Sequence, residues 1–446
     1  MKVLFSNPPW WEAPEGSFLR RRWRVGVRAG SRWPFTYPTR CRPGRYRFGD
    51  YVPYPFFMGY AATYARRVTG ADVRLRDSVA LRETYEEWLR HLEVEKYDYV
   101  FVESATPSWD HDARLLHAIR GRLPAARLVV TGPVTTTRAE EILRDHPVHA
   151  CIRGEYEKGS VEILEGRSGI LDFDLLSVEE MNAAPFPWFD DLHAHRYWDE
   201  NPRGQVAPQA QVWSSRGCPF KCIFCVWPAT MTGNDPDGEQ RRTARHYTPE
   251  YMEAYLREIV DRYRFRSIYF DDDTFNLGNG HVIRMCEVMR RIGLPWSAMC
   301  RADTSKMETW QLMRDSGCFG VKIGFESGSQ QVVDTIVNKH LDLEYARSAV
   351  HEIQRVGMSV HGTFTYGLPG ETREQMLETR RFVRSIPFDS VQESGTAEIE
   401  GTPLHTLRVR GRLERFGDAR IDAGYSRETD GNKKWHRLVE DLRDRT

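Results

Sequence analysis

The chain has 446 residues, 40% hydrophobic and 28% charged, which is the composition of a globular protein of about two to three domains. Lys plus Arg and Asp plus Glu number 63 each, a balance that excludes a strongly basic protein of nucleic acid or membrane surfaces. The chain has no run of about 18 apolar residues, the length needed to span a bilayer. The apolar run at the N-terminus is short and interrupted, so it does not fit a signal peptide. We expect a cytoplasmic protein.

Strand and helix patterns alternate through the first third of the chain. Strands are expected at 2–6, 71–75, 97–103, 127–132 and 150–153, and helices at 54–68, 84–94, 112–123 and 138–145. This alternation is typical of a doubly wound parallel sheet, which binds ligands at the carboxyl ends of its strands. The sequence therefore predicts an α/β, Rossmann-like domain over residues 1–160, with a long Arg-, Trp-, Gly- and Pro-rich segment at 7–53.

A second alternation follows a proline-containing linker at 161–207. Its strands are expected at 211–213, 267–270, 296–299, 320–324, 359–365 and 390–393, and its helices at 249–262, 281–290, 309–315, 330–337, 343–356 and 373–384. Six such units predict a partial (β/α)6 barrel over 208–405, open on one side. Residues 406–446 are polar and are expected to form a short C-terminal extension with a surface helix around 433–443.

Three of the eight cysteines stand together, as Cys218, Cys222 and Cys225, on a loop after the first barrel strand. Soft thiolates suit an iron–sulfur cluster or zinc, and zinc sites take four ligands. No fourth cysteine or histidine stands close by, so a cluster on this loop would leave one iron open to another ligand. A zinc knuckle completed by a distant residue is the alternative. The other cysteines (Cys41, Cys151, Cys286, Cys300 and Cys318) are expected to be small buried hydrophobes.

With the aromatic Phe224, these cysteines resemble the signature of the radical S-adenosylmethionine (SAM) superfamily. The resemblance covers about 208–405 and implies a [4Fe–4S] cluster that splits SAM reductively into methionine and a 5′-deoxyadenosyl radical. Four later landmarks at strand ends are similar to the family's SAM-binding elements. The implied cofactor contacts are Phe224, Asp271, Asp272, Asp273, Arg301, Glu326, Ser327, Gly367 and Leu368.

Three of these landmarks have structural alternatives. The acidic run at 271–273 is also compatible with a solvated turn or a helix cap, and Glu326 with a strand-end residue paired with Arg or Lys. Pro-Gly in the segment 367–372 is explained by turn chemistry alone.

The N-terminal third resembles the cobalamin-binding domain of one radical SAM class, in the strings Asn7–Trp10, Arg28–Pro34 and Arg153–Glu157. The D-x-H-x-x-G motif, whose histidine ligates cobalt in many such domains, is absent. Its nearest counterpart, Asp191-Leu192-His193, lacks the glycine. Cobalamin therefore stays open as a third cofactor.

The expected reaction depends on whether cobalamin binds. Without cobalamin, the resemblance favours a diol dehydratase of the kind found in apramycin-type aminoglycoside (antibiotic) biosynthesis. Such an enzyme is a lyase that dehydrates a paromamine-like amino sugar, and Glu393 and Glu398 are candidate substrate carboxylates. With cobalamin, the alternative is a C-methyltransferase of secondary metabolism.

Either reaction implies a small-molecule substrate and an external electron donor of the flavodoxin or ferredoxin type, or a partner reductase. No nucleic-acid or membrane partner is expected. A non-catalytic electron-transfer protein is disfavoured, because the four further landmarks predict a SAM pocket.

Overall fold

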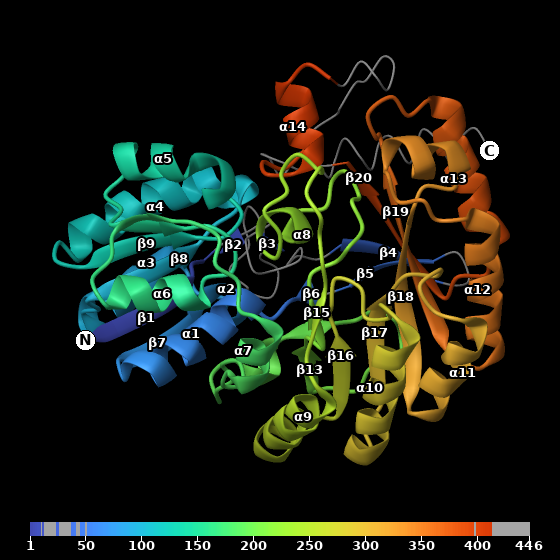
Figure 1. Ribbon diagram of the computed structural model, residues 1–446, viewed down its shortest axis with the longest axis horizontal. Helices are drawn as coiled ribbons and strands as arrows, with labels where there is room; N and C mark the ends of the chain where they lie inside the picture. The colour runs from blue at the N-terminus through green and yellow to red at the C-terminus, as the bar shows by residue number, and fades with distance from the viewer. Residues whose placement is uncertain are drawn as a thin grey trace. The chain divides into compact units, whose positions relative to one another are not determined.

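The computed structural model describes residues 1–9, 11–12, 24–25, 37–41, 45–49, 51–396 and 398–412. The chain divides into two compact units (Figure 1): one comprises 1–36, 50–199 and 229–236, the other 37–49, 200–228 and 237–446. Trp10, the segment Arg28–Pro34 and the helix predicted at 433–443 lie outside the described residues. No described helix combines the length and apolarity needed to cross a bilayer.

The first unit is built on a six-stranded parallel sheet. In sheet order, the strands are β11 (Gly169–Leu171), β10 (Ala150–Ile152), β9 (Arg127–Thr131), β8 (Tyr99–Glu103), β1 (Lys2–Asn7) and β7 (Asp72–Asp77). The main helices are α1 (Phe56–Thr69), α3 (Tyr85–Glu95), α4 (Trp109–Arg122), α5 (Thr135–Asp145) and α6 (Glu157–Leu164). Shorter elements are β2 (Trp11–Glu12), β3 (Arg24–Val25), β6 (Tyr51–Val52), β12 (Trp198–Asp199), α2 (Ser78–Leu81), α7 (Val178–Ala183) and the 3-10 helices η2 (Thr106–Ser108) and η3 (Ala194–Arg196).

Helices cover both faces of this sheet, which confirms the doubly wound fold. On one face α3, α4 and α5 bury a core that includes Trp88, Leu116 and Ile142. On the other face α1 and α6 pack side by side (Figure 1). Strand β8 is buried along its whole length, as expected for a parallel strand covered from both sides.

The second unit holds six parallel strands, as predicted, and a hairpin at one edge. In sheet order, the strands are β13 (Gln209–Val212), β16 (Ser267–Phe270), β17 (Trp296–Cys300), β18 (Cys318–Glu326), β19 (Ser359–Tyr366), β20 (Ser390–Gly395), β4 (Tyr37–Cys41) and β5 (Arg45–Gly49). The helices are α9 (Pro249–Tyr263), α10 (Asn279–Ile292), α11 (Met307–Asp315), the π-helix η4 (Val332–Ile336), α12 (Leu343–Arg355), α13 (Arg373–Ser385) and α14 (Pro403–Val409). The short ribbon β14 (Ser215–Arg216) and β15 (Arg245–His246) stands apart from the sheet, and α8 (Trp227–Thr230) follows the cysteine loop.

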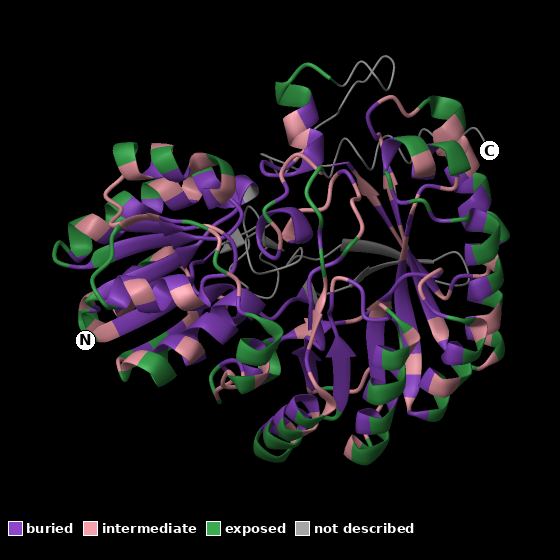
Figure 2. Ribbon diagram, in the orientation of Figure 1, coloured by how far each residue is buried: buried purple, intermediate pink, exposed green. Residues whose placement is uncertain are grey.

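The helix layer identifies the inner face of this barrel. Phe325 on β18 and Phe364 on β19 stack on each other and contact Phe382 of α13. Because side chains alternate along a strand, their neighbours Glu326 and Thr365 point to the opposite, inner face. Figure 2 shows the consequence for burial: the strands are buried, and the helices expose only their outer sides.

Segments 37–49 and 169–171 differ from the predicted domain assignment. The first was expected within the N-terminal domain, but β4 pairs antiparallel with β20 of the second unit. A partial barrel leaves the backbone groups of its last strand unpaired, and the hairpin satisfies those of β20. The second segment was expected in a linker, but β11 completes the first sheet, and the predicted boundary at residue 160 lies inside α6.

We predict that Gly132→Ala destabilises the protein much more than Gly70→Ala. Both glycines have a positive φ, which costs an alanine about 1 kcal/mol. A Cβ at Gly70 meets nothing within 4 Å, whereas one at Gly132 stands 2.4 Å from the Ser104 carbonyl oxygen. Relieving that overlap adds about 1–3 kcal/mol. Urea unfolding of the two variants measures the difference, and equal losses would contradict the close approach.

Candidate active site

The three predicted cysteine ligands lie on the loop that follows β14, and each is a free thiol. The loop turns tightly, because the Cys225 N–H donates to the Cys222 carbonyl oxygen at 3.1 Å. Burial raises the pKa of Cys218 to about 11 and that of Cys225 well above its usual range. The other two sulfurs raise the pKa of Cys225 further, so the three thiols lie near one another.

This donor set fits an iron–sulfur cluster better than a single ion. Buried neighbouring thiols resist ionisation, and only a strongly positive partner makes three thiolates favourable there. Among the described residues, no group of three Cys, His, Asp or Glu converges as ligands of one metal ion. A cubane instead binds each cysteine to a different iron and so needs the sulfurs farther apart.

Hydrogen bonds to three other segments fix the loop. The Ile223 N–H donates to the Val337 carbonyl at 3.0 Å, and the Leu404 N–H to the Ile223 carbonyl at 2.9 Å. Arg242 donates to the Phe220 carbonyl at 3.1 Å. Phe224 and Cys222 pack against an apolar cluster of Val332, Ile336, Val337 and Leu368. Two predicted cofactor contacts, Phe224 and Leu368, therefore share one apolar wall beside the loop.

The three aspartates after β16 have different surroundings. Asp272 is fully buried and accepts from the Ser214 N–H at 3.1 Å and from the Ser214 and Ser215 hydroxyls at 2.9 and 2.5 Å. Burial raises its pKa to about 6, and these hydrogen bonds oppose the rise. Asp271 accepts from the Tyr269 hydroxyl at 3.0 Å. The charge of Asp273 raises the pKa of Cys218 and Cys225, so this carboxylate lies near the thiols.

Arg301 lies beside the cysteine loop. Its guanidinium stands 3.6 Å from the centre of the Phe220 ring and donates twice to Asp303, at 2.8 Å each. It also donates to the Lys339 carbonyl at 3.0 Å. The remaining terminal nitrogen, Nη1, is buried and has no hydrogen-bond partner. This atom is available to an anionic ligand such as the carboxylate of SAM.

Glu326 ends β18 in a left-handed conformation, with a φ of 69°, just after an irregularity in the strand pairing. Its carboxylate accepts from Lys339 Nζ at 2.9 Å, as the structural alternative anticipated. The pair is not remote from the site, because Lys339 lowers and Glu326 raises the pKa of Cys222.

Ser327, Gly367 and Leu368 were predicted to contact SAM, but their polar groups form hydrogen bonds with other residues of the protein. The Ser327 hydroxyl pairs with that of Thr379 at 3.0 Å. The N–H groups of Gly367 and Leu368 donate to the Glu371 carboxylate at 2.8 and 3.1 Å, which accounts for the turn. Burial raises the pKa of Glu371 to about 7.

The two speculative substrate carboxylates both have protein partners. Glu393 accepts from the Tyr366 hydroxyl at 2.9 Å and from buried Arg380 at 2.5 Å. Glu398 pairs with His405 at 2.7 Å and with Arg408. Both carboxylates are therefore already paired within the protein and are not free to bind the amino group of a sugar substrate.

Sequence reasoning missed Phe220, Lys339 and Thr274. Phe220 and Lys339 surround Arg301, and Thr274 contacts Cys218. The sequence could have indicated Phe220 as a site residue, because it lies between Cys218 and Cys222. Lys339 lies 38 residues from Arg301, and no motif in the sequence connects the two.

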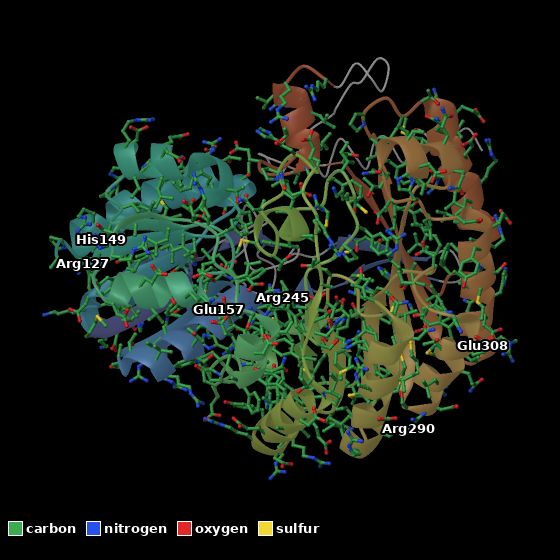
Figure 3. All side chains as sticks on the ribbon, in the orientation of Figure 1. Arg127, His149, Glu157, Arg245, Arg290 and Glu308 are labelled. Atoms are coloured by element: carbon green, nitrogen blue, oxygen red, sulfur yellow. The ribbon has the colours of Figure 1, made fainter. Side chains whose placement is uncertain are left out.

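Three of the first unit's buried polar atoms without a hydrogen-bond partner lie at the carboxyl edge of the sheet. They are Asn7 Oδ1 at the end of β1, Thr106 Oγ1 after β8 and Thr136 Oγ1 at the start of α5. Arg127 and His149, labelled in Figure 3, lie at the opposite, amino end of the same strands. Unsatisfied groups of this kind are typical of a ligand edge in a doubly wound sheet.

His193, the nearest match to a cobalt-ligating histidine, is already engaged. Its Nδ1 lies 2.7 Å from the Asp190 carboxylate, and its Nε2 accepts the Asp77 N–H at 3.2 Å. The ring is buried and has no free nitrogen for a metal.

A cavity of about 720 Å³ opens on the second unit beside the cysteine loop. Lys221 and Ile223, which flank Cys222 in the chain, form part of its wall. Asn338 and residues of α14 line it as well.

Comparison with known proteins shows which families this chain resembles. Residues 214–383 match the family model of the radical SAM superfamily. An uncharacterized methyltransferase of Pyrococcus horikoshii is 26% identical over 381 residues, which cover 80% of this chain and 79% of that protein. The bacteriochlorophyllide d C-12(1)-methyltransferase of Chlorobaculum tepidum is 21% identical over 72% of this chain and 67% of its own.

Solved structures share the fold across both units. The radical SAM methyltransferase TsrM of Kitasatospora setae, with cobalamin and a [4Fe–4S] cluster bound, aligns with a TM-score of 0.61. The match is 15% identical and covers 91% of this chain and 77% of that one. The cobalamin-dependent SAM radical enzyme OxsB aligns over 87% of this chain and 59% of its own, with 15% identity and a TM-score of 0.56.

These relatives overturn the favoured reaction. Radical dehydration of an amino sugar, with its lyase and aminoglycoside assignments, was wrong, because three curated relatives with significant similarity to this chain are named methyltransferases and none of these three is named a dehydratase. The findings support the alternative that the sequence analysis kept.

We predict that Cys218→Ala, Cys222→Ala and Cys225→Ala each abolish stable iron and sulfide binding. Each removes one of the three ligands that the cysteine loop offers to a cluster. Cys286→Ala, a buried thiol on α10, is the matched control and should retain the cluster. Iron and sulfide analysis after anaerobic reconstitution measures the effect, and full retention in any loop variant would contradict the ligand assignment.

Proposed function

Because residues 214–383 form a radical SAM domain, we propose that this chain is a cobalamin-dependent radical SAM methyltransferase acting on a small-molecule acceptor. The proposal rests on how much of this chain aligns with one relative. The alignment with a relative named a methyltransferase covers 80% of this chain and so runs through both units. A radical SAM enzyme that shared only the barrel would align over the second unit alone.

The residues around the cysteine loop suit the binding of SAM beside a cluster. When bound, the cluster supplies the electron that splits SAM, and cobalamin supplies the methyl group for the acceptor. Cys218, Cys222 and Cys225 would hold the cluster. Arg301 offers Nη1 to the SAM carboxylate, and Asp273 would face its amino group.

The remaining site residues orient these groups or exclude water. Asp303 and Phe220 hold the Arg301 guanidinium from two sides, which fixes the direction of its open nitrogen. Phe224 and Leu368 contribute apolar surface next to Cys222, and such surface strengthens electrostatic contacts by keeping water away.

The carboxyl edge of the first sheet is the proposed cobalamin site. Asn7, Thr106 and Thr136 place unsatisfied polar atoms on three neighbouring strand ends, and corrin side chains are rich in amides that can pair with them. Both nitrogens of His193 are used, so cobalamin would bind there without a ligand from this residue.

Reductive splitting of SAM takes one electron, which a reductant must supply to the cluster. We propose an external carrier of the flavodoxin or ferredoxin type. Its approach would be through the cavity walled by Lys221 and Ile223, because the cysteine loop meets the surface there.

The decisive experiment is anaerobic reconstitution with iron and sulfide, with and without hydroxocobalamin, followed by desalting and reaction with SAM and a reductant. We expect about one retained cobalamin per chain and formation of both 5′-deoxyadenosine and S-adenosylhomocysteine. A cluster that forms deoxyadenosine with no retained cobalamin would contradict the methyltransferase. The absence of both products would contradict the radical SAM activity itself.

We further predict that Thr106→Val and Thr136→Val weaken hydroxocobalamin retention by about tenfold each. A lost hydrogen bond that leaves a buried partner unsatisfied is worth about 1–3 kcal/mol. Thr63→Val on α1 is the matched control, because that hydroxyl already bonds to the Gly59 and Tyr60 carbonyls of its own helix. Equilibrium dialysis measures the affinity of the three variants for hydroxocobalamin. If all three bind it equally well, the carboxyl edge is not the cobalamin site.

A further inference from the structure

Thr274 is a buried residue that contacts a cluster ligand directly. Its hydroxyl oxygen lies 3.5 Å from Cys218 Sγ and 2.7 Å from the Asp273 carbonyl oxygen, to which it donates. The residue is 3% exposed, so water does not compete for these contacts. No other hydroxyl hydrogen bond to the three cysteine sulfurs is found in the described part of the chain.

The position of Thr274 is fixed from both sides. Two residues earlier, Asp272 accepts from both hydroxyls of Ser214 and Ser215, which precede the cysteine loop. One residue later, the Phe275 N–H donates to the Met299 carbonyl at 2.8 Å. His281 of α10 adds a contact of 2.9 Å to the Ser214 hydroxyl. The turn that carries Thr274 and the start of the loop that carries Cys218 therefore form one connected unit.

We propose that Thr274 is a positioning residue that donates a hydrogen bond to the Cys218 thiolate and raises the reduction potential of the cluster. The inference rests on the cluster of the radical SAM domain, and is independent of cobalamin and of the methyl acceptor. In the free thiol, Cys218 can donate its proton to the hydroxyl. A thiolate can only accept, so the hydroxyl hydrogen turns from the Asp273 carbonyl to the sulfur.

The direction of the effect follows from charge. Reduction adds one electron from the external carrier to [4Fe–4S]²⁺ and gives [4Fe–4S]⁺, with no proton transferred. The added electron increases the negative charge on the sulfurs, so a hydrogen bond to sulfur stabilises the reduced form more than the oxidised form. Asp273 acts in the opposite sense, because its negative charge near Cys218 and Cys225 disfavours the added electron.

The test is an EPR-monitored redox titration of the reconstituted cluster in Thr274→Val, Thr274→Ser and Asp273→Asn, each without SAM. Valine keeps the shape of threonine and removes the hydroxyl. We expect Thr274→Val to shift the oxidised-to-reduced equilibrium about tenfold toward the oxidised form, which is about 59 mV for a one-electron couple. Thr274→Ser should keep the native potential, and Asp273→Asn should shift it in the opposite direction.

An unchanged potential in Thr274→Val, with iron content equal to that of the native protein, would overturn the proposal. So would a serine variant that behaves like valine, because it would assign the effect to packing. If Thr274→Val loses the cluster, ENDOR of the native reduced cluster in H₂O and D₂O decides: an exchangeable hydroxyl proton coupled to the cluster is expected, and its absence overturns the proposal. Failure of the native chain to bind iron would instead contradict the radical SAM assignment.

Discussion

The buried carboxylate of Asp272 determines where the cysteine loop begins. It ties the end of β16 to the residues that follow β13, through one backbone and two hydroxyl hydrogen bonds from Ser214 and Ser215. Burying an ionised carboxylate is costly, and here this cost is offset only by several donors that converge on it. Removing these bonds would leave the start of the loop held by the β14–β15 pairing and by the Tyr247 N–H bond to the Ser214 carbonyl, without its connection to the end of β16.

Charges around the loop are arranged in pairs. Arg301 is paired with Asp303, and Lys339 with Glu326, and each pair is largely buried. Pairing lets cations lie close to the cysteines without the full desolvation cost of isolated charges. Cys222 therefore has both an apolar wall and internally neutralised charge pairs near it, while Asp273 adds negative charge near Cys218 and Cys225.

The two units follow a common rule for parallel sheets. Polar groups accumulate at the carboxyl ends of the strands, where helix starts and loops leave backbone and side-chain donors open. In the first unit these are Asn7, Thr106 and Thr136. In the second they are Asp273, Arg301 and the cysteine loop itself. Two relatives named methyltransferases align over 80% and 72% of this chain, so each alignment extends into both units.

The sequence by itself determined what depends on local chemistry. The spacing of Cys218, Cys222 and Cys225 predicted the ligand set, because three thiols within eight residues stay close together in any fold. Apolar segments predicted five of the six parallel strands of the first unit and all six of the second, with ends within about two residues of those observed. Strand β11 was missed because the short run at 169–171 has too little pattern. Only the tertiary structure decided which of the aspartates at 271–273 faces the thiols, since burial and partners, not residue type, separate Asp272 from Asp273. It also decided that β4 covers the edge of β20, that Lys339 reaches the site and that Thr274 contacts Cys218, because contacts between residues far apart in the chain leave no local signal.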